Sequence, residues 1–374
     1  MELQDFLLDL DENDEFGAIA RDEFLQFGIP GEPELLGATI LPERLTTRRQ
    51  GNLYRETRIR YLTNIALPST RYAPAQKTGG GVAVGSFLVE LSESDAASEF
   101  TAEDYDTFLD HLEEDADQEA ASLLLGWGRR SLIYGLVQLN EKQRWDAIVD
   151  SKVIRRGDGG ILEPVEYADP AGHRVSTTLD YSDAADDPME DILGAKEFLA
   201  DKGVTIVRII MSTQLQSILV RNPNVREAIL PNIITLTNGN AQTQTRGATT
   251  NAALDEYLRS HRLPAVETYD AKYRKADGTY HRYLRDDCIV IIGSTPLTET
   301  VRATADPEYF RVLENTLGYV AIGRAAGQRT SGRVVHVEGF TNKPPRVTGE
   351  AWQTSLPVIM EPESIYVIKD IPLP

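Results

Sequence analysis

The residue types that most often carry catalysis or bind metals are sparse and scattered in this chain. No two of the five histidines stand at the spacing of a metal site, and there is one cysteine. The histidines are His111, His173, His261, His281 and His336. Phosphate-binding glycine loops, the nucleophile elbow of hydrolases and the zinc-protease helix motif are absent from the sequence. We therefore predict a protein that is not an enzyme and that uses no metal or cofactor.

Carboxylates are the abundant titratable groups, with 58 Asp and Glu against 38 Lys and Arg, for a net charge of −20. Adjacent pairs such as Asp286 and Asp287 can perform acid–base catalysis when burial shifts their pKa values. In so acidic a chain exposed pairs arise by chance, and we interpret these pairs as solvated. The net charge also opposes tight, general binding of nucleic acid by the whole chain.

The cysteine content and the apolar runs indicate where the chain is made. A single cysteine excludes an intrachain disulfide framework, and Cys288 begins an apolar run, so we expect a buried thiol. No apolar run approaches the roughly 20 residues that a membrane helix needs. The acidic N-terminus lacks the basic start of a secretory signal. These features favour synthesis in the cytosol.

Charge is arranged in blocks along the first third of the chain. Residues 1–43 hold twelve acidic side chains and one Arg, residues 44–77 hold eight basic side chains and one Glu, and residues 93–119 hold twelve acidic side chains and no basic one. The blocks are either solvated faces without a role or a basic arm that lies on the acidic surface of a neighbouring copy. Complementarity of the second kind steers association and fixes register.

The second interpretation names two sets of residues that would meet between copies. The basic set is Arg55, Arg58, Arg60, Arg71 and Lys77. The acidic set, on another copy, is Glu103, Asp106, Asp110, Glu113, Glu114 and Asp117. One exposed ion pair contributes only about 0–1 kcal/mol, so the sets matter as blocks.

Two stretches predict a projecting ribbon followed by a long helix. Residues 53–67 and 82–91 read as strands, and the first has polar residues on both faces, so it cannot pack on its own core. A two-stranded ribbon is marginal in water and needs a partner surface. Residues 101–139 carry apolar side chains at helical spacing after a capping box of Thr101 and Asp104, although Gly126 and two further glycines can bend the helix.

The rest of the chain predicts a mixed α/β module with flanking strands. Before it, residues 1–40 read as an arm with one short helix near 16–28, and residues 147–180 read as β-rich. Within the module we expect helices, strands and a hairpin, and we expect residues 237–251 to form a mobile polar loop. The expected helices are 188–202, 212–221 and 251–261, the strands are 204–211, 288–292 and several within 333–374, and the hairpin is 268–284. The fold class is α+β.

Several motifs of this sequence resemble those of tailed-phage major capsid proteins. They are LDYSDAADDPMEDI (179–192), IIMST (209–213), RNPNVR (221–226), DCIVII (287–292) and LPVIMEPE (356–363). In this order, after the arm, ribbon and long helix, they resemble the lambda-type major capsid protein E family of the Hong Kong 97 fold. The resemblance covers roughly residues 50–374 and is densest over 175–295.

The resemblance implies a division of the chain into five parts. Residues 1–45 would be the N-terminal arm and 46–95 the extended loop, which lies over a neighbouring subunit. Residues 96–182 would be the peripheral domain with its spine helix, to which strands 330–374 return. Residues 183–329 would be the axial domain.

The resemblance also implies the function, the partners and the location. Many copies, in hexamers and pentamers, would form an icosahedral head that encloses double-stranded DNA without sequence-specific binding. Scaffold, portal and decoration proteins would be further partners, and the location would be the virion. Some relatives cross-link a loop lysine to an asparagine, and the corresponding pair here would be Lys77 and Asn342.

Two alternatives remain open from the sequence. One is an encapsulin-type nanocompartment shell that encloses protein cargo. The other is a soluble acidic enzyme whose module at 185–325 binds a small ligand.

Overall fold

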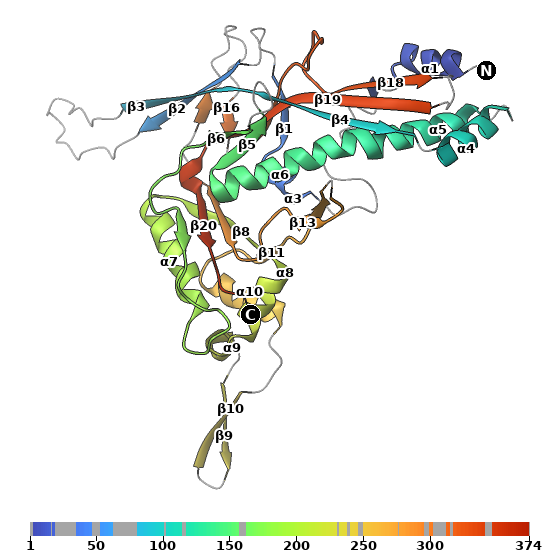
Figure 1. The fold of residues 1–374 in the computed structure, drawn as a ribbon. Coiled ribbons are helices and arrows are strands. Elements are labelled where there is room, and N and C mark those ends of the chain that lie inside the picture. Colours follow the sequence, from blue (N-terminus) through green and yellow to red (C-terminus); the bar gives the residue numbers. More distant parts are fainter. Residues whose placement is uncertain are drawn as a thin grey trace, which may run out of the picture. The chain divides into compact units, whose positions relative to one another are not determined.

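The computed structural model resolves the chain into two compact units. Unit 1 comprises Met1–Arg55, Leu88–Tyr167 and Gly318–Ile359, and unit 2 comprises Glu56–Phe87, Ala168–Leu317 and Met360–Pro374. The residues described are 3–15, 17–18, 35–46, 53–62, 81–100, 102–113, 117–156, 162–229, 232–237, 240–245, 250–275, 277–294, 299–301, 312–314, 317–340 and 346–373. Figure 1 traces their helices and strands.

Unit 1 is built on a five-stranded sheet around one long strand. The strand β19 (Arg346–Ile359) pairs antiparallel with β4 (Ser92–Glu99), β17 (Gly318–Ile322) and β18 (Val334–Phe340). The short strand β1 (Glu43–Leu45) extends the sheet by pairing parallel with β17. The same unit contains the antiparallel pair β5 (Lys152–Arg156) and β6 (Leu162–Glu166).

Helical segments surround this sheet. They are α1 (Leu3–Glu12), α3 (Leu36–Ile40), α4 (Ala102–Glu113), α5 (Asp117–Gly128), a π-helical turn at Arg129–Ile133 and α6 (Tyr134–Asp150). Of these, α4, α6 and the π-helical turn contact β19, α1 contacts β18, and α3 packs on α6. A Cβ on Gly349 would lie 2.6 Å from the Trp127 ring and 2.7 Å from Leu132, so a larger residue there would force these side chains to move. Phe100, Phe108 and Leu124 continue the apolar core.

The predicted helix over 101–139 is too short at its C-terminal end. Helical structure continues to Asp150 and ends at Ser151, whose φ of +53° is left-handed. The error arose because α6 buries Asn140, Glu141 and Arg144 among its apolar residues, which hides its buried face in the sequence. Thr101 of the expected capping box lies outside the described residues.

Unit 2 is an α/β module, as predicted. Its five-stranded sheet has the order β11-β8-β14-β20-β7, in which β8 (Thr205–Met211) and β14 (Ile289–Ser294) are central. The other strands are β11 (Val266–Thr268), β20 (Ile365–Lys369) and β7 (Arg174–Ser176). Ile209, Met211 and Ile291 belong to a core cluster that includes apolar residues of the helices.

Three of the four described helices of unit 2 begin at side-chain caps that the sequence specifies. The four are α7 (Pro188–Asp201), α8 (Thr213–Arg221), α9 (Pro223–Ile229) and α10 (Asn251–Ser260). Asp187, Ser212 and Thr250 each accept a hydrogen bond from a backbone amide in the first turn of α7, α8 and α10. Each such cap stabilises a helix by about 1 kcal/mol, which explains why these predicted helices are confirmed.

Several strand pairs stand apart from the two main sheets. The predicted ribbon is confirmed as the pair β2 (Leu53–Leu62) and β3 (Gly81–Glu90). The predicted hairpin is confirmed in shorter form as β12 (Lys272–Arg274) with β13 (Tyr280–Arg282), and β15 (Glu299–Val301) pairs with β16 (Val312–Glu314).

The prediction of a polar loop at 237–251 is wrong. Strands β9 (Asn232–Thr237) and β10 (Asn240–Thr245) pair antiparallel there, over six residue pairs. The dipeptide Asn238-Gly239 between them is a strong hairpin signal, which the polar composition outweighed in the prediction. Helix α10 begins within the same range, at Asn251. The short helix expected near 16–28 falls almost wholly outside the described residues.

The helices of the described residues are too short or too polar to span a lipid bilayer. Across the same residues, no group of three or more His, Cys, Asp or Glu side chains is arranged to hold a metal ion. Cys288 is buried, as expected.

Candidate functional site: charged surfaces and a buried polar cluster

Helix α4 presents three residues of the predicted acidic set to solvent. Glu103, Asp106 and Asp110 are exposed at a spacing of three and four residues, which places them on one helix face. Tyr105 and Phe108 are buried on the other side, where burial, with a contribution from Asp106, raises the pKa of Tyr105. Glu103, Asp106 and Asp110 therefore form an exposed acidic face of α4, and its contact with another copy stays a prediction.

For the other predicted contact residues, the structure describes the backbone alone or nothing. Arg55, Arg58 and Arg60 lie on β2, Glu113 ends α4 and Asp117 begins α5, but the side chains of these five lie outside the description. Arg71, Lys77, Glu114 and Asn342 lie outside the described residues. The two sets stand on separate elements, and their pairing stays a prediction.

A second acidic surface lies on the sheet of unit 1. Alternate residues Glu93, Asp95 and Glu99 of β4 are exposed, and residues of β4 pair across β19 in register. On the same sheet face, Glu350 of β19 and Glu338 of β18 are also exposed. The sequence indicated the acidic block of residues 93–119, but only the strand register adds the carboxylates from β18 and β19. We call these five residues the acidic sheet face.

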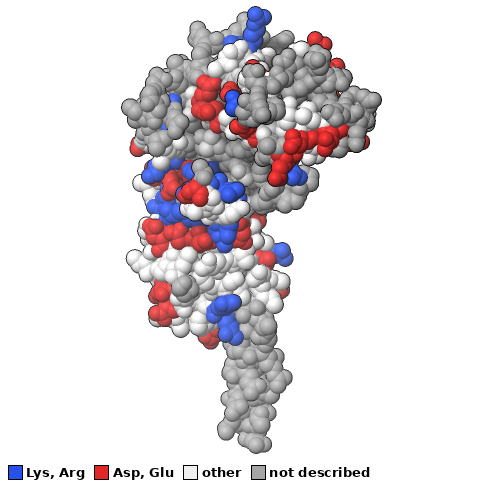
Figure 2. Space-filling view, turned by 45° about the vertical axis from the view of Figure 1, so that its right-hand side comes forward, with Lys and Arg blue, Asp and Glu red and all other residues white. Residues whose placement is uncertain are grey.

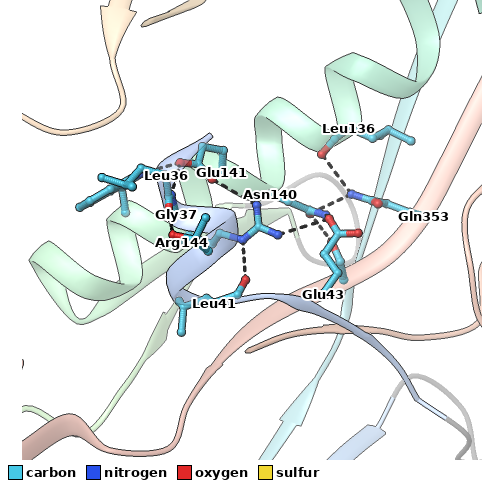
Figure 3. Close-up of polar contacts among 12 residues, drawn as sticks. Leu36, Gly37, Leu41, Glu43, Leu136, Asn140, Glu141, Arg144 and Gln353 are labelled. Carbon is cyan, nitrogen blue, oxygen red and sulfur yellow. Dashed lines mark hydrogen bonds and ion pairs between the residues drawn. The ribbon is translucent and has the colours of Figure 1, made fainter. Parts of the chain in front are cut away.

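Beneath this sheet, the segment 35–46 is held to α6 by buried polar contacts (Figure 3). Arg144 of α6 donates from Nε to the Leu41 carbonyl at 2.9 Å and from Nη2 to Glu43 Oε1 at 3.4 Å. Its Nη1 donates to Glu141 Oε2 at 3.2 Å, so a fully buried guanidinium faces two carboxylates. We call this group, with Gly37, Asn140, Arg333 and Gln353, the Glu43 cluster.

Glu43 is the carboxylate on which most of these side chains converge. It accepts hydrogen bonds from Arg144, Arg333 and Asn140, the last at 2.8 Å. Burial opposes its ionisation, but the two guanidinium groups and these hydrogen bonds outweigh burial and hold the pKa of Glu43 below its ordinary value. Glu43 is therefore charged in the folded chain at neutral pH.

The remaining contacts connect the cluster to the neighbouring strand and helix. Gln353 of β19 donates from Nε2 to Asn140 Oδ1 at 2.9 Å and accepts from Arg333 Nε at 2.9 Å. Glu141 Oε1 accepts from the Gly37 amide at 2.7 Å and from the Trp145 indole at 2.8 Å. These contacts satisfy the buried charges and fix the segment 35–46, but they form no catalytic arrangement.

Sequence reasoning missed the Glu43 cluster. Asn140 and Arg144 stand one helical turn apart beside Glu141, which is a pattern typical of a solvated helix face. Their partners are about 100 residues earlier or 200 residues later in the chain, so no local spacing could identify them.

In unit 2 a buried histidine joins α7 to β20. His173 Nδ1 lies 2.8 Å from the Ile365 carbonyl, which can only accept, so Nδ1 carries the proton. Lys202 Nζ lies 2.7 Å from Nε2 and donates to it, and the same ammonium stands 4.3 Å from the Phe198 ring centroid. Burial lowers the pKa of His173, which keeps the imidazole neutral.

Solved structures of other proteins share the fold of this chain. The chain is similar to a protein described as a prophage capsid protein from Escherichia coli CFT073, at 15% identity and a TM-score of 0.56, covering 96% of this chain and 98% of that one. Two weaker similarities are to a phage-related protein from Bordetella bronchiseptica RB50 (14% identity, TM-score 0.49, coverage 94% and 98%) and to the SrpI encapsulin of Synechococcus elongatus PCC 7942 (11%, 0.43, 92% and 89%). No curated protein sequence matches the chain.

This chain has the Hong Kong 97 fold. It is a shell-forming structural protein and not an enzyme. Residues 135–329, which are 195 of 374, match the family described as phage major capsid protein E. The chain belongs to this family. It is a structural subunit of a phage head, which self-assembles and is located in the virion capsid. The resemblance, fold class and shell function expected from the sequence are confirmed.

Proposed function

We propose that the subunits are joined by the β2–β3 ribbon of one copy lying on the acidic face of α4 of another, in an icosahedral shell around packaged double-stranded DNA. The observation that carries this proposal is the exposed row of Glu103, Asp106 and Asp110 on α4, in a chain whose paired strands β2 and β3 stand apart from both main sheets. A two-stranded ribbon gains stability from a partner surface, and the neighbouring copy supplies one.

The division into parts that the resemblance implies belongs to the same proposal. Residues 1–45 act as the N-terminal arm, 46–95 as the extended loop, 96–182 with 330–374 as the peripheral domain and 183–329 as the axial domain. The compact units of the structure instead divide the chain at 55/56, 87/88, 167/168, 317/318 and 359/360. Scaffold, portal and decoration proteins are further partners, and synthesis takes place in the host cytoplasm.

Charge reversal tests the ribbon contact. We expect Arg55→Glu, Arg58→Glu and Arg60→Glu together to abolish particles, because like charges would face each other across the contact. Combining them with Glu103→Lys, Asp106→Lys and Asp110→Lys should restore particles. Sedimentation and electron microscopy of the expressed protein measure both results. Unchanged particle yield in the triple Arg variant would exclude this contact.

Two further measurements test the finer parts of the proposal. DNA in particles from infected cells supports the packaging of a genome, and particles that contain none would contradict it. Boiling particles in detergent tests a cross-link between Lys77 and Asn342, because cross-linked chains do not enter a gel as monomers. Chains that all migrate as monomers would exclude the cross-link.

A further inference from the structure

The β12–β13 hairpin of unit 2 carries an exposed basic surface on a strongly acidic protein. Lys272, Arg274 and Lys275 are all exposed in a chain of net charge −20. In the hairpin register, Lys272 lies opposite Arg282 and Arg274 opposite Tyr280, so these four side chains share one face. Figure 2 shows Lys and Arg gathered on the side of the molecule where β13 lies, with Asp and Glu beside them. We call Lys272, Arg274 and Lys275 the basic hairpin.

The hairpin is held rigid, which makes its basic side chains suitable for a specific contact. On its other face Tyr273 stands 6.0 Å from the His281 ring and 5.1 Å from the Tyr283 ring, which in turn stacks on Tyr269 at 6.3 Å. Arg282 is tied to Asp270 and, at 3.1 Å, to Asp286. A preorganised element loses little entropy when it docks.

The cations of the basic hairpin are not neutralised by the described parts of this chain. Within those parts, no ion pair within 4.0 Å involves Lys272, Arg274 or Lys275, although Asp277 in the turn lies close enough to interact with Lys275. This contrasts with Arg282 and Arg285 of the same segment, which are each paired with aspartates. Among the described residues, Lys272, Arg274 and Lys275 therefore form no ion pair, and Asp277 is the one carboxylate noted near them.

The acidic sheet face offers a matching row of charges, in which Glu99 at one end is paired with Arg346 at 3.9 Å and the other four carboxylates form no ion pair among the described residues. Lys272 and Arg274 alternate along β12, and Glu93 and Asp95 alternate along β4. Alternate residues of a strand are about 6.5–7 Å apart, so both rows have the same spacing. On the next strand, Glu350 pairs in register with Ala97, which adds a carboxylate to the gap in the β4 row.

We propose that the basic hairpin of one subunit docks on the acidic sheet face of a second copy. This inference rests on the proposed assembly function. It adds a second contact between copies, separate from the contact of the β2–β3 ribbon with α4. Each copy would give its hairpin to one neighbour and receive a hairpin from another, which is the head-to-tail arrangement that closes into a ring around a rotation axis. A second copy fits better than nucleic acid, because the net charge of −20 repels phosphate while every copy carries the acidic face.

The test uses two charge-reversed variants of the full chain. One carries Lys272→Glu, Arg274→Glu and Lys275→Glu, and the other carries Asp95→Lys, Glu338→Lys and Glu350→Lys. We expect each alone to lower particle yield at least about tenfold, because like charges then meet at every contact. We expect their combination in one chain to restore particles. We expect coexpression of the two to restore them in part, because the two variants can alternate around a six-membered ring but not around a five-membered one. Coexpression restores only a contact between copies, because a contact within one chain stays mismatched in both variants.

The outcomes separate this inference from its alternatives. The control Arg221→Glu, Arg226→Glu and Arg259→Glu makes the same change in net charge, from −20 to −26, at other exposed positions of unit 2. Equal loss in the control would overturn the inference, because net charge alone would explain it. Normal particles from the hairpin variant would also overturn it, whether or not their DNA content falls. Absence of particles from the unmodified chain would instead contradict the assembly function itself.

Discussion

The backbone amide of Gly37 donates a hydrogen bond to Glu141 Oε1 at 2.7 Å and joins residues that are 104 positions apart. A Cβ at position 37 would lie 2.7 Å from both carboxylate oxygens, so this approach requires glycine. The N-terminal segment 35–46 is thus fitted to α6 by backbone as well as by side chains.

Gly37→Ala should destabilise the subunit by about 1–3 kcal/mol, the cost typical of overpacking a well-packed interior. The added methyl group would push the buried Glu141 carboxylate away from its partners. Denaturant unfolding of unassembled subunits measures this. The matched control is Gly126→Ala in α5, where a Cβ meets nothing within 4 Å and a helix gains about 0.5–1 kcal/mol. Equal stability of the two variants would contradict the close approach.

Arg144→Met should cost about 3–5 kcal/mol, because it leaves Glu141 without its cation and the Leu41 carbonyl without its donor. The neighbouring Lys142→Met is the control, since Lys142 is partly exposed and its pair with Asp146 contributes at most about 1 kcal/mol. The same unfolding experiment compares them. A loss below 1 kcal/mol for Arg144→Met would show that the Glu43 cluster is not buried in solution.

Acid should weaken the Glu43 cluster. The pKa of Glu43 in the folded chain lies below its ordinary value of 4.5. Its contribution to the free energy of unfolding is therefore full above pH 4.5 and is lost as the pH falls through the pKa of the folded chain. Glu43→Gln should therefore flatten the decline of unfolding free energy below pH 4.5. Glu103→Gln, on the exposed face of α4, serves as the comparison. An identical acid slope in wild type and Glu43→Gln would refute the assignment.

His173 predicts a second pH effect in a higher range. Its pKa is lowered in the folded chain, so the unfolded chain binds more protons below its ordinary value of 6.5. The stability that neutral His173 contributes is then fully present above pH 6.5. It falls as the pH drops from 6.5 towards the pKa of His173 in the folded chain. His173→Gln should remove this part of the slope, as measured by thermal unfolding at pH 7.5 and 5.5. The slope should persist in His281→Gln, where the histidine is exposed.

Much of the fold could be predicted because its signals are local. Helix α7 is set by Asp187 as its cap, by Pro188 in its first turn and by apolar residues at helical spacing, all within 14 residues. The ribbon β2–β3 and the acidic face of α4 likewise follow from residue types at fixed intervals. The errors arose where composition misled: polar residues hid the end of α6 and the hairpin β9–β10.

By itself, the sequence determined the α+β class, the order of the elements, the blocks of charge and the family motifs, because these depend on residues that are neighbours in the chain. Only the tertiary structure decided that Glu43, Arg144 and Gln353 meet, and that carboxylates of β4, β18 and β19 share one face. The reason is physical. A buried charge is satisfied by whichever groups the packing brings to it, and strand register places side chains from distant segments side by side.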